Sequence, residues 1–305
     1  MTRSANRLCR CAPWIAACLV WTSCAVLRPG FRAPVEPFAQ PLAGVGDLAR
    51  RIEKYQAPIG TLNAQLQVLA QGGDVRGKQK FTLLMLYRSP DCVKLKATGM
   101  VAGGLFEVTL KGAEVSLYFQ REGRFYRGAL SELEGDPRAL NGVRPMDVVR
   151  ALLVSQEVAE WLRRVPAGRE LAASDDRHWA LNVAMSPTRN EVFAIRRADG
   201  LVEEAGVYDS TGHEEVRLMK VSVVYRRYAY FDGRLLPSRF ELFFADTGLR
   251  LRVDLQKARP NVDLPEARFS LDPPKELAGD VKPLSEWLKR LQPPQPGSKA
   301  GAHDH

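Results

Sequence analysis

The sequence predicts a mainly β (α+β) fold, a curled antiparallel sheet covered by a few α-helices. Between residues 59 and 256, many short segments alternate apolar and polar side chains, which is the period of a strand with one buried face. Turn signals such as Gly72-Gly73 and Asp199-Gly200 separate these segments and are typical of hairpins. Segments with helical spacing are few, so we expect an antiparallel meander rather than alternating helices and strands.

Composition places the chain among ordinary globular proteins. Its 305 residues are 45% hydrophobic, which is enough for a real core. The formal net charge is +9, but the cations are mixed with acids and form no Lys/Arg block. We therefore predict no nucleic-acid partner. A mild attraction to anionic lipid head groups stays open beside an ordinary solvated surface.

The N-terminal segment has the features of a secretory leader. It carries three arginines and no acid, then a short apolar run, Ala12–Val20, then small residues before Cys24. A cysteine at the end of such a leader is typical of bacterial lipoproteins, in which it becomes the lipid-modified N-terminus. We predict a signal peptide at 1–23, lipidation of Cys24, and a lipoprotein anchored in the cell envelope, facing the periplasm at the outer membrane.

Two alternatives to Cys24 stay open. Trp21 stands where such leaders usually hold Leu, whereas the residues before Cys18 fit better but leave almost no apolar run. An unlipidated signal or anchor is the second alternative. The apolar run is shorter than the ~20 residues of a spanning helix. Beyond residue 24 the chain has one cysteine, Cys92, so we expect a buried structural thiol and no disulfide framework.

After the leader, a Pro-rich stretch at 24–45 without periodicity predicts an extended tether. A helix is expected from about Asp47 to the residues before Pro58. The period then changes to two, which predicts a half-barrel domain at 46–275. Strands are expected at 59–69, 77–87, 92–97, 105–110, 115–119 and 124–127, then at 178–184, 191–197, 201–209, 215–230, 240–244 and 249–256.

Two further helices are expected. Pro145 suits a first helical position and opens a central helix. Within 276–292 the apolar residues fall at helical spacing, which predicts a short amphipathic helix. A helix this short is marginal alone, so it must dock on the sheet or on a membrane surface. The composition of residues 293–305 predicts a disordered tail. We do not interpret its two histidines as a metal site.

The search for catalytic motifs finds none. No phosphate-binding loop, dinucleotide fingerprint, zinc-protease helix or nucleophile elbow is present. His178 and His213 lie in or beside strands without a nearby cysteine or paired carboxylate, and Asp175-Asp176 is interpreted as a solvated turn. We therefore predict that the protein is not an enzyme and needs no cofactor. A hydrolase site assembled by the fold from distant residues is the remaining enzymatic hypothesis.

The predicted sheet has one apolar face, and that face must be covered. Few helices are available, so they would cover it only in part, and the remaining space could hold an apolar ligand. A solid core is the alternative, and periodicity does not separate the two. The candidate cavity residues are Leu83, Met85, Leu95, Phe106, Leu117, Phe119, Phe240, Leu242, Phe244, Leu251 and Val253.

Several motifs resemble the LolA/LolB-like lipoprotein-binding superfamily over residues 46–275. They include Arg88-Ser89-Pro90 before a strand, a Phe-x-Val strand at Phe106, and a closing run with Asn261 and Phe269. The resemblance implies an incomplete antiparallel β-barrel (half-barrel) covered by a few α-helices. Extra length before the C-terminal strands and the C-terminal helix depart from that pattern.

The resemblance also implies a function. The expected activity is that of a membrane-tethered binding protein for acyl chains or lipidated proteins in the envelope, without covalent chemistry. The alternative is a structural or regulatory envelope protein, similar to an RseB-type sensor, that binds a protein partner through its sheet edge or C-terminal helix.

Overall fold

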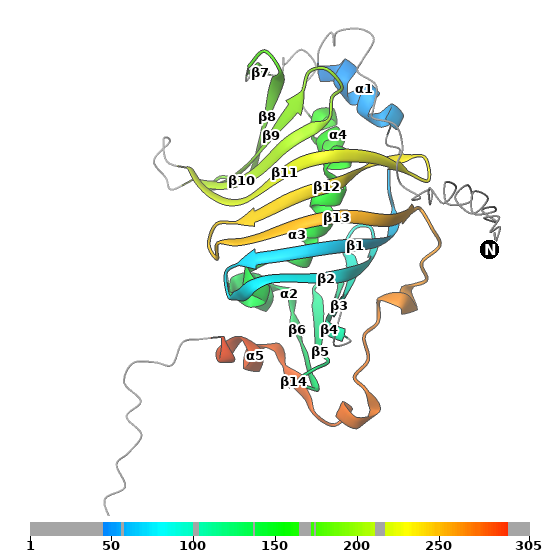
Figure 1. Ribbon diagram of the computed structural model, residues 1–305, viewed down its shortest axis with the longest axis vertical. Helices are drawn as coiled ribbons and strands as arrows, with labels where there is room; N and C mark the ends of the chain where they lie inside the picture. Colours follow the sequence, from blue (N-terminus) through cyan, green and yellow to red (C-terminus); the bar gives the residue numbers. More distant parts are fainter. Residues whose placement is uncertain are drawn as a thin grey trace, which may run out of the picture.

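The computed structural model is dominated by one large curved sheet with helices on its inner face (Figure 1). The predicted signal peptide, Cys24, the tether and the tail lie outside the described residues. No helix in the described part of the chain is long and apolar enough to cross a membrane. The structure describes residues 45–55, 58–99, 104–136, 138–164, 172–173, 175–210 and 217–291.

Fourteen strands form the sheet, in the order β14-β6-β5-β4-β3-β2-β1-β13-β12-β11-β10-β9-β8-β7. Every neighbouring pair is antiparallel except β14 with β6. The end strands do not pair with each other, so the predicted half-barrel fold is confirmed. The strands are β1 Thr61–Gly72, β2 Val75–Arg88, β3 Cys92–Gly99, β4 Gly104–Lys111, β5 Glu114–Phe119, β6 Arg124–Ala129, β7 Ala172–Ala173, β8 His178–Ser186, β9 Arg189–Arg196, β10 Val202–Ser210, β11 Arg217–Phe231, β12 Arg234–Phe244, β13 Leu249–Pro260 and β14 Val281–Pro283.

The helices lie mainly on the inner, concave side of this sheet (Figure 1). The central pair, α3 and α4, follow one another with a single residue between them. Their apolar side chains join those of the strands in one core. The helices are α1 Val45–Tyr55, α2 Leu130–Gly135, α3 Pro145–Leu152, α4 Val154–Arg164 and α5 Leu284–Arg290, with short 3-10 helices η1 Ala139–Gly142, η2 Glu266–Phe269 and η3 Lys275–Leu277.

Pairing of β1 with β13 joins the first and last long strands at the centre of the sheet. Their inward residues meet in register, as Val68 does with Val253. Where β13 ends, the side chain of Asn261 accepts a hydrogen bond from the backbone N–H of Gly60 at 2.9 Å. The same side chain donates one to the carbonyl oxygen of Pro58 at 3.1 Å. The asparagine of the closing motif therefore ties the end of β13 to the start of β1.

The chain beyond β13 forms a strap over the outer face of β3 and β4. The ammonium group of Lys94 donates to the carbonyl oxygen of Ser270 at 2.9 Å, and the guanidinium of Arg127 donates to that of Leu271 at 3.3 Å. Phe269, the aromatic residue of the closing motif, is fully buried. The strap reaches the far edge of the sheet, where β14 adds beside β6 (Figure 1).

Helix α5 docks on this edge through a close contact with β6. Leu284 is fully buried, and a Cβ atom added to Gly128 would lie 2.5 Å from the Cβ of Leu284. The ring of Trp287 lies 5.5 Å from that of Phe119 and 6.4 Å from that of Tyr126, measured between centroids. The sheet, rather than a membrane surface, therefore covers this helix.

The structure differs from the sequence predictions in its short elements. Helix α2, the strands β7 and β14, and η1 were not expected. Leu140 and Asn141 adopt left-handed backbone angles, with φ of 49° and 57°, which no sequence pattern indicated. Of the segment 276–292, only 284–290 is α-helical, because Pro283 has extended angles and fixes the helix start.

Replacing Gly128 by alanine should loosen the docking of α5. The added methyl group clashes with Leu284, so we expect a loss of about 1–3 kcal/mol in the free energy of unfolding, measured by urea denaturation. Gly279→Ala is the matched control, because an added Cβ there meets nothing within 4 Å. Equal stability of the two variants would contradict the proposed contact.

Candidate functional site

An apolar cavity of about 400 Å³ lies between the inner face of the sheet and the helices. Its walls come from strands β1 to β5 and β13, from the loop that contains η1, from the start of α3, and from α5. The volume falls in the range of small-molecule sites, ~300–1,000 Å³. The apolar lining consists of Val68, Ala70, Val75, Phe81, Leu83, Leu95, Leu105, Phe106, Val108, Phe119, Leu140, Val143, Pro145, Val148, Leu249, Leu251, Val253, Trp287 and Leu291.

The cavity opens beside the β1–β2 turn, where two central strands of the sheet end. Asp74 and Gln79 both line it and are both exposed to solvent. Only Arg138 and Asn141 add further polar side chains to the lining. The polar groups therefore lie at the mouth and in the loop that covers the cavity, and the strand residues of its wall are otherwise apolar.

The cover of the cavity is held by one arginine. The guanidinium of Arg138 donates to the carbonyl oxygen of Leu291 at 3.2 Å, which joins the end of α5 to the loop before η1. It also contacts the carboxylate of Asp136 at 2.8 Å. This hydrogen bond lowers the pKa of Asp136, so the carboxylate keeps its charge. The two covering segments, far apart in sequence, are thereby linked.

The structure places six of the eleven predicted residues on the cavity wall and five elsewhere. The other five are buried in the core and do not line the cavity. Helix α3 packs on β12, which carries Phe240, Leu242 and Phe244, so the inner face of this strand is covered, and Phe244 lines a smaller neighbouring pocket instead. On the wall lie Leu83, Leu95, Phe106, Phe119, Leu251 and Val253; away from it lie Met85, Leu117, Phe240, Leu242 and Phe244.

The sequence predictions missed 17 of the 23 lining residues, about three quarters. In β1 apolar residues recur at every second position from Leu62 to Ala70, and these are the buried ones. This alternation could have identified Val68 and Ala70. The helical spacing that predicted α5 also identified Trp287 and Leu291, but not the space they face. Nothing in the pattern marked the residues of the η1 loop.

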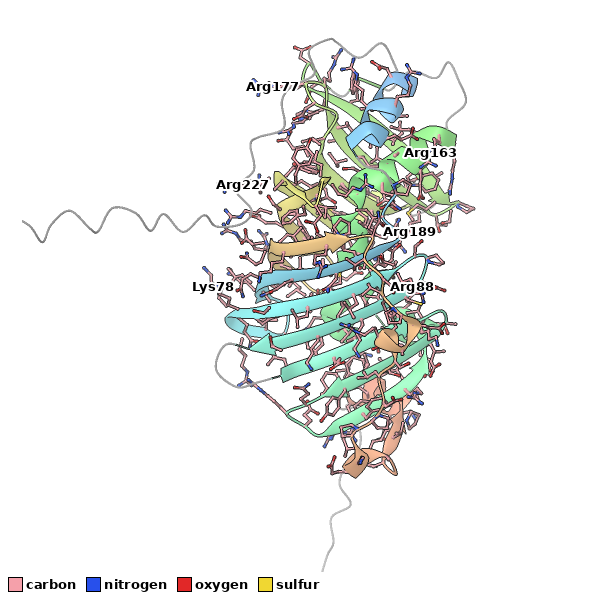
Figure 2. All side chains as sticks on the ribbon, turned by 90° about the vertical axis from the view of Figure 1, so that its right-hand side faces the viewer. Lys78, Arg88, Arg163, Arg177, Arg189 and Arg227 are labelled. Carbon is pink, nitrogen blue, oxygen red and sulfur yellow. The ribbon has the colours of Figure 1, made fainter. Side chains whose placement is uncertain are left out.

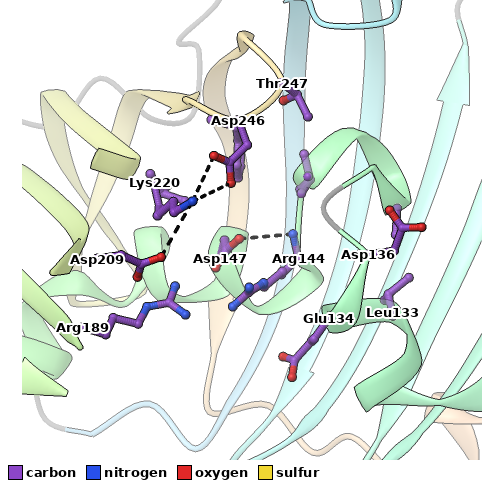
Figure 3. A pocket seen from close by; sticks show the side chains of 15 residues that line it. Leu133, Glu134, Asp136, Arg144, Asp147, Arg189, Asp209, Lys220, Asp246 and Thr247 are labelled. Carbon is purple, nitrogen blue, oxygen red and sulfur yellow. Dashed lines mark hydrogen bonds and ion pairs between the residues drawn. The ribbon is translucent and has the colours of Figure 1, made fainter. Parts of the chain in front are cut away.

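A second pocket, of about 150 Å³, is polar and adjoins the first, with Val143 in both walls. Figure 3 shows Lys220 between two carboxylates, at 3.1 Å from Asp246 and 3.7 Å from Asp209. The carboxylate of Asp147 accepts a hydrogen bond from the backbone N–H of Arg144 at 3.1 Å and caps α3. Burial raises the pKa of Asp147. Lys220 and its two carboxylates bind one another, which favours a structural role for these three residues.

A buried charge cluster lies between α3, α4 and β9. The guanidinium of Arg150 contacts the carboxylates of Glu157 and Glu191, the latter at 3.1 Å. Glu191 is only 5% exposed. Burial, together with the neighbouring charge of Glu157, raises the pKa of Glu191 to about 7. The guanidinium of Arg150 is therefore shared by two carboxylates, and the pKa of Glu191 lies near neutral pH.

His178 has carboxylate partners, so the prediction that it lacks them is wrong. Its Nδ1 lies 3.0 Å from Asp175 and its Nε2 lies 2.6 Å from Glu203, which β10 brings beside β8 through β9. The Asp175 and Glu203 bonds raise the pKa of His178. With both ring nitrogens bound, this histidine does not activate a nucleophile, and neither cavity contains it.

The other reactive groups give no further site. Cys92 is partly exposed rather than buried, and desolvation raises the pKa of its thiol, which disfavours the reactive thiolate. Among the residues that the structure describes, no group of three or more His, Cys, Asp or Glu side chains could hold a metal ion. The apolar cavity is therefore the candidate functional site.

Glu191 should make stability depend on pH. Its pKa rises from 4.5 to about 7 on folding, so its stabilising contribution is full below pH 4.5 and is lost as pH rises through 7. We expect wild-type protein to lose on the order of 1–3 kcal/mol more than Glu191→Gln between pH 5 and 8, measured by urea denaturation. Glu204→Gln, at an exposed position, is the control; a wild-type profile parallel to that of Glu191→Gln would contradict the assignment.

No protein-family model and no curated protein matches this sequence. Among solved structures, a LolA superfamily protein from Nitrosomonas europaea aligns with a TM-score of 0.50 at 12% identity, over 75% of this chain and 98% of that one. A putative outer membrane lipoprotein-sorting protein domain from Vibrio parahaemolyticus aligns at 0.49 with 14% identity, over 74% and 96%. A DUF1329 family protein from Desulfovibrio piger aligns at 0.46 with 14% identity, over 76% and 98%. The chain therefore has the fold of a LolA superfamily protein.

Proposed function

We propose that the protein binds an acyl chain, free or attached to a lipidated protein, in the apolar cavity. The observation that carries this proposal is the cavity of about 400 Å³, which has apolar strand residues along its wall and a mouth beside the β1–β2 turn. An acyl chain has no polar groups that the wall would leave unsatisfied, whereas a polar ligand would lose hydrogen bonds to water. The carboxylate or head group would stay at the mouth.

The expected binding energy is moderate. Each buried methylene contributes ~0.8 kcal/mol, so ten methylenes contribute about 8 kcal/mol gross. Association and side-chain ordering oppose binding by an estimated 4 kcal/mol or more. Reversible binding follows, which suits a protein that accepts a lipid and releases it. No covalent step is proposed.

The proposal includes a place in the cell. The LolA-like fold and the leader both favour the bacterial envelope, with the domain facing the periplasm and held at the outer membrane by a lipid on Cys24. A tether at 24–45 would keep the cavity close to a membrane that supplies or receives the lipid. The alternative, a regulatory protein that binds an envelope partner, keeps the fold but needs no ligand in the cavity.

Polar substitution of a wall residue should weaken acyl binding. Phe106→Ser removes a half-buried ring from the cavity wall, so we expect the affinity for a fluorescent fatty acid to fall roughly tenfold. Phe243→Ser is the matched control, because Phe243 is also half-buried but does not line the cavity. An equal loss of affinity in both variants would mean that the ring of Phe106 affects binding only through the stability of the fold.

Native mass spectrometry of the purified protein tests the proposal itself. We expect bound species with the masses of fatty acids or phospholipids. A protein that purifies empty and takes up no fluorescent fatty acid would overturn acyl binding. Recovery of one stoichiometric protein partner without lipid, from solubilised envelope, would favour the regulatory alternative.

Metabolic labelling with an alkyne palmitate tests the anchor. We expect label on the wild-type chain and none on Cys24→Ser, because the thiol at position 24 is the proposed acceptor. Cys18→Ser is the matched control and should keep its label. Label retained on Cys24→Ser would rule that residue out.

A further inference from the structure

Four cations form a compact group on the outer face of the sheet, beside the cavity mouth. In the register of β2, β1 and β13, Lys80 and Arg252 flank Leu69, and Lys78 and Arg250 flank Gln71. Paired residues of neighbouring strands point to the same face, so these four side chains share the face opposite the cavity. Strand spacing of ~4.8 Å places the two lysines about 10 Å from the two arginines. We call this group the outer basic surface.

One acid, Glu241, adjoins the outer basic surface, in register with Arg252 on the neighbouring strand. All four side chains are exposed, and none forms an ion pair with a described carboxylate. The nearest acids on adjoining positions have other partners, since Glu241 pairs with Arg226 at 3.8 Å and Asp254 pairs with Arg239.

Other parts of the same face are different. Lys94 and Lys96, on β3, both pair with Glu107, at 3.0 Å and 3.5 Å. The strap covers Lys94 as well, because its ammonium group bonds to the carbonyl oxygen of Ser270. The strap also crosses at the opposite end of β2 and β3 from the outer basic surface, which it leaves open. Figure 2 shows Lys78 and Arg88 at the two ends of β2.

The outer basic surface and the cavity mouth share one rim. Gln79 lines the cavity, and its two chain neighbours, Lys78 and Lys80, project from the other face of β2. Leu251 lines the cavity between Arg250 and Arg252 in the same way. A flat anionic surface in contact with the four cations would therefore lie beside the opening of the cavity.

We propose that the outer basic surface docks on the anionic head groups of a phospholipid bilayer, with the cavity mouth next to the lipid. Four exposed cations on an open strand face form no enclosed pocket for a single carboxylate or phosphate ligand, whereas each cation near an anionic membrane surface adds attraction of about 1 kcal/mol. Leu69 lies between the two rows and Leu84 is 43% exposed nearby on β2, so apolar contact adds to the charge. The guanidinium of Arg250 stacks over Phe243, at 5.0 Å from the ring centroid.

Vesicle binding tests this docking. The full chain carrying Cys24→Ser, verified by mass to have no acyl group, is sedimented with phosphatidylcholine vesicles and with vesicles that also contain phosphatidylglycerol. We expect binding only to the anionic vesicles, and its loss at high salt, because exposed charges more than ~10 Å apart are screened at 0.1 M salt. Lys78→Gln/Arg250→Gln should bind anionic vesicles roughly 25-fold more weakly, since each cation near an anionic membrane contributes about a factor of five.

Arg177→Gln/Arg227→Gln is the matched control for net charge. Both arginines are exposed and lie away from Lys78, Arg227 on β11 and Arg177 in the bend before β8 (Figure 2). Binding that is equal on neutral and anionic vesicles, or that falls equally in the two double variants, would overturn the proposal. Circular dichroism and fatty-acid uptake should match wild type in both, because none of the four substituted residues lines the cavity. Failure of the docking and failure of acyl binding are therefore separate results.

Discussion

The organisation of this protein depends on how much of one apolar sheet face two helices can cover. Fourteen strands spaced by ~4.8 Å extend roughly 60 Å along the curve of the sheet. Helices α3 and α4 together contain 19 residues, from 8 and 11, and span only about 28 Å. Where they lie, aromatic and aliphatic side chains of β8 to β12 pack into a solid core. Beyond them, shorter elements must cover what remains, and a cavity is left.

The C-terminal strap supplies that second cover. It starts where Asn261 ties β13 to β1 and then crosses the outer face of the sheet, where the buried side chain of Phe269 holds it in place. It then reaches the edge of the sheet, where β14 pairs with β6. Only then can α5 place Trp287 against the inner side. Arg138 bonds the last turn of α5 and so links this helix to the η1 loop, and apolar residues of both segments, among them Trp287 and Leu140, pack against the core.

The inner and outer faces of the sheet also differ in the charges that they carry. Inside the sheet, the arginine at 150 contacts two carboxylates beneath the helices, whereas the charged side chains of the cavity lining, Asp74 and Arg138, lie at its mouth and in its cover. Outside, lysines near the strap are paired with Glu107, whereas Lys78 and Lys80 near the cavity mouth form no ion pair with a carboxylate in the described part of the chain. The one sheet thus presents an apolar cavity on its inner face and a cationic surface on its outer face at the same rim.

The sequence by itself determined the class of fold, because strand alternation and hairpin turns are local signals that do not depend on the rest of the chain. It located most strands, the central helix and α5, and it showed which residues of each strand share a face. Only the tertiary structure decided which of those residues meet empty space. Phe240 and Phe106 have the same pattern in their strands, yet one is covered by the core and the other lines the cavity. That difference depends on where α3 and α4 end over the sheet, and on a strap folded from the opposite end of the chain. Both are contacts between segments far apart in sequence, and no period in either segment encodes them.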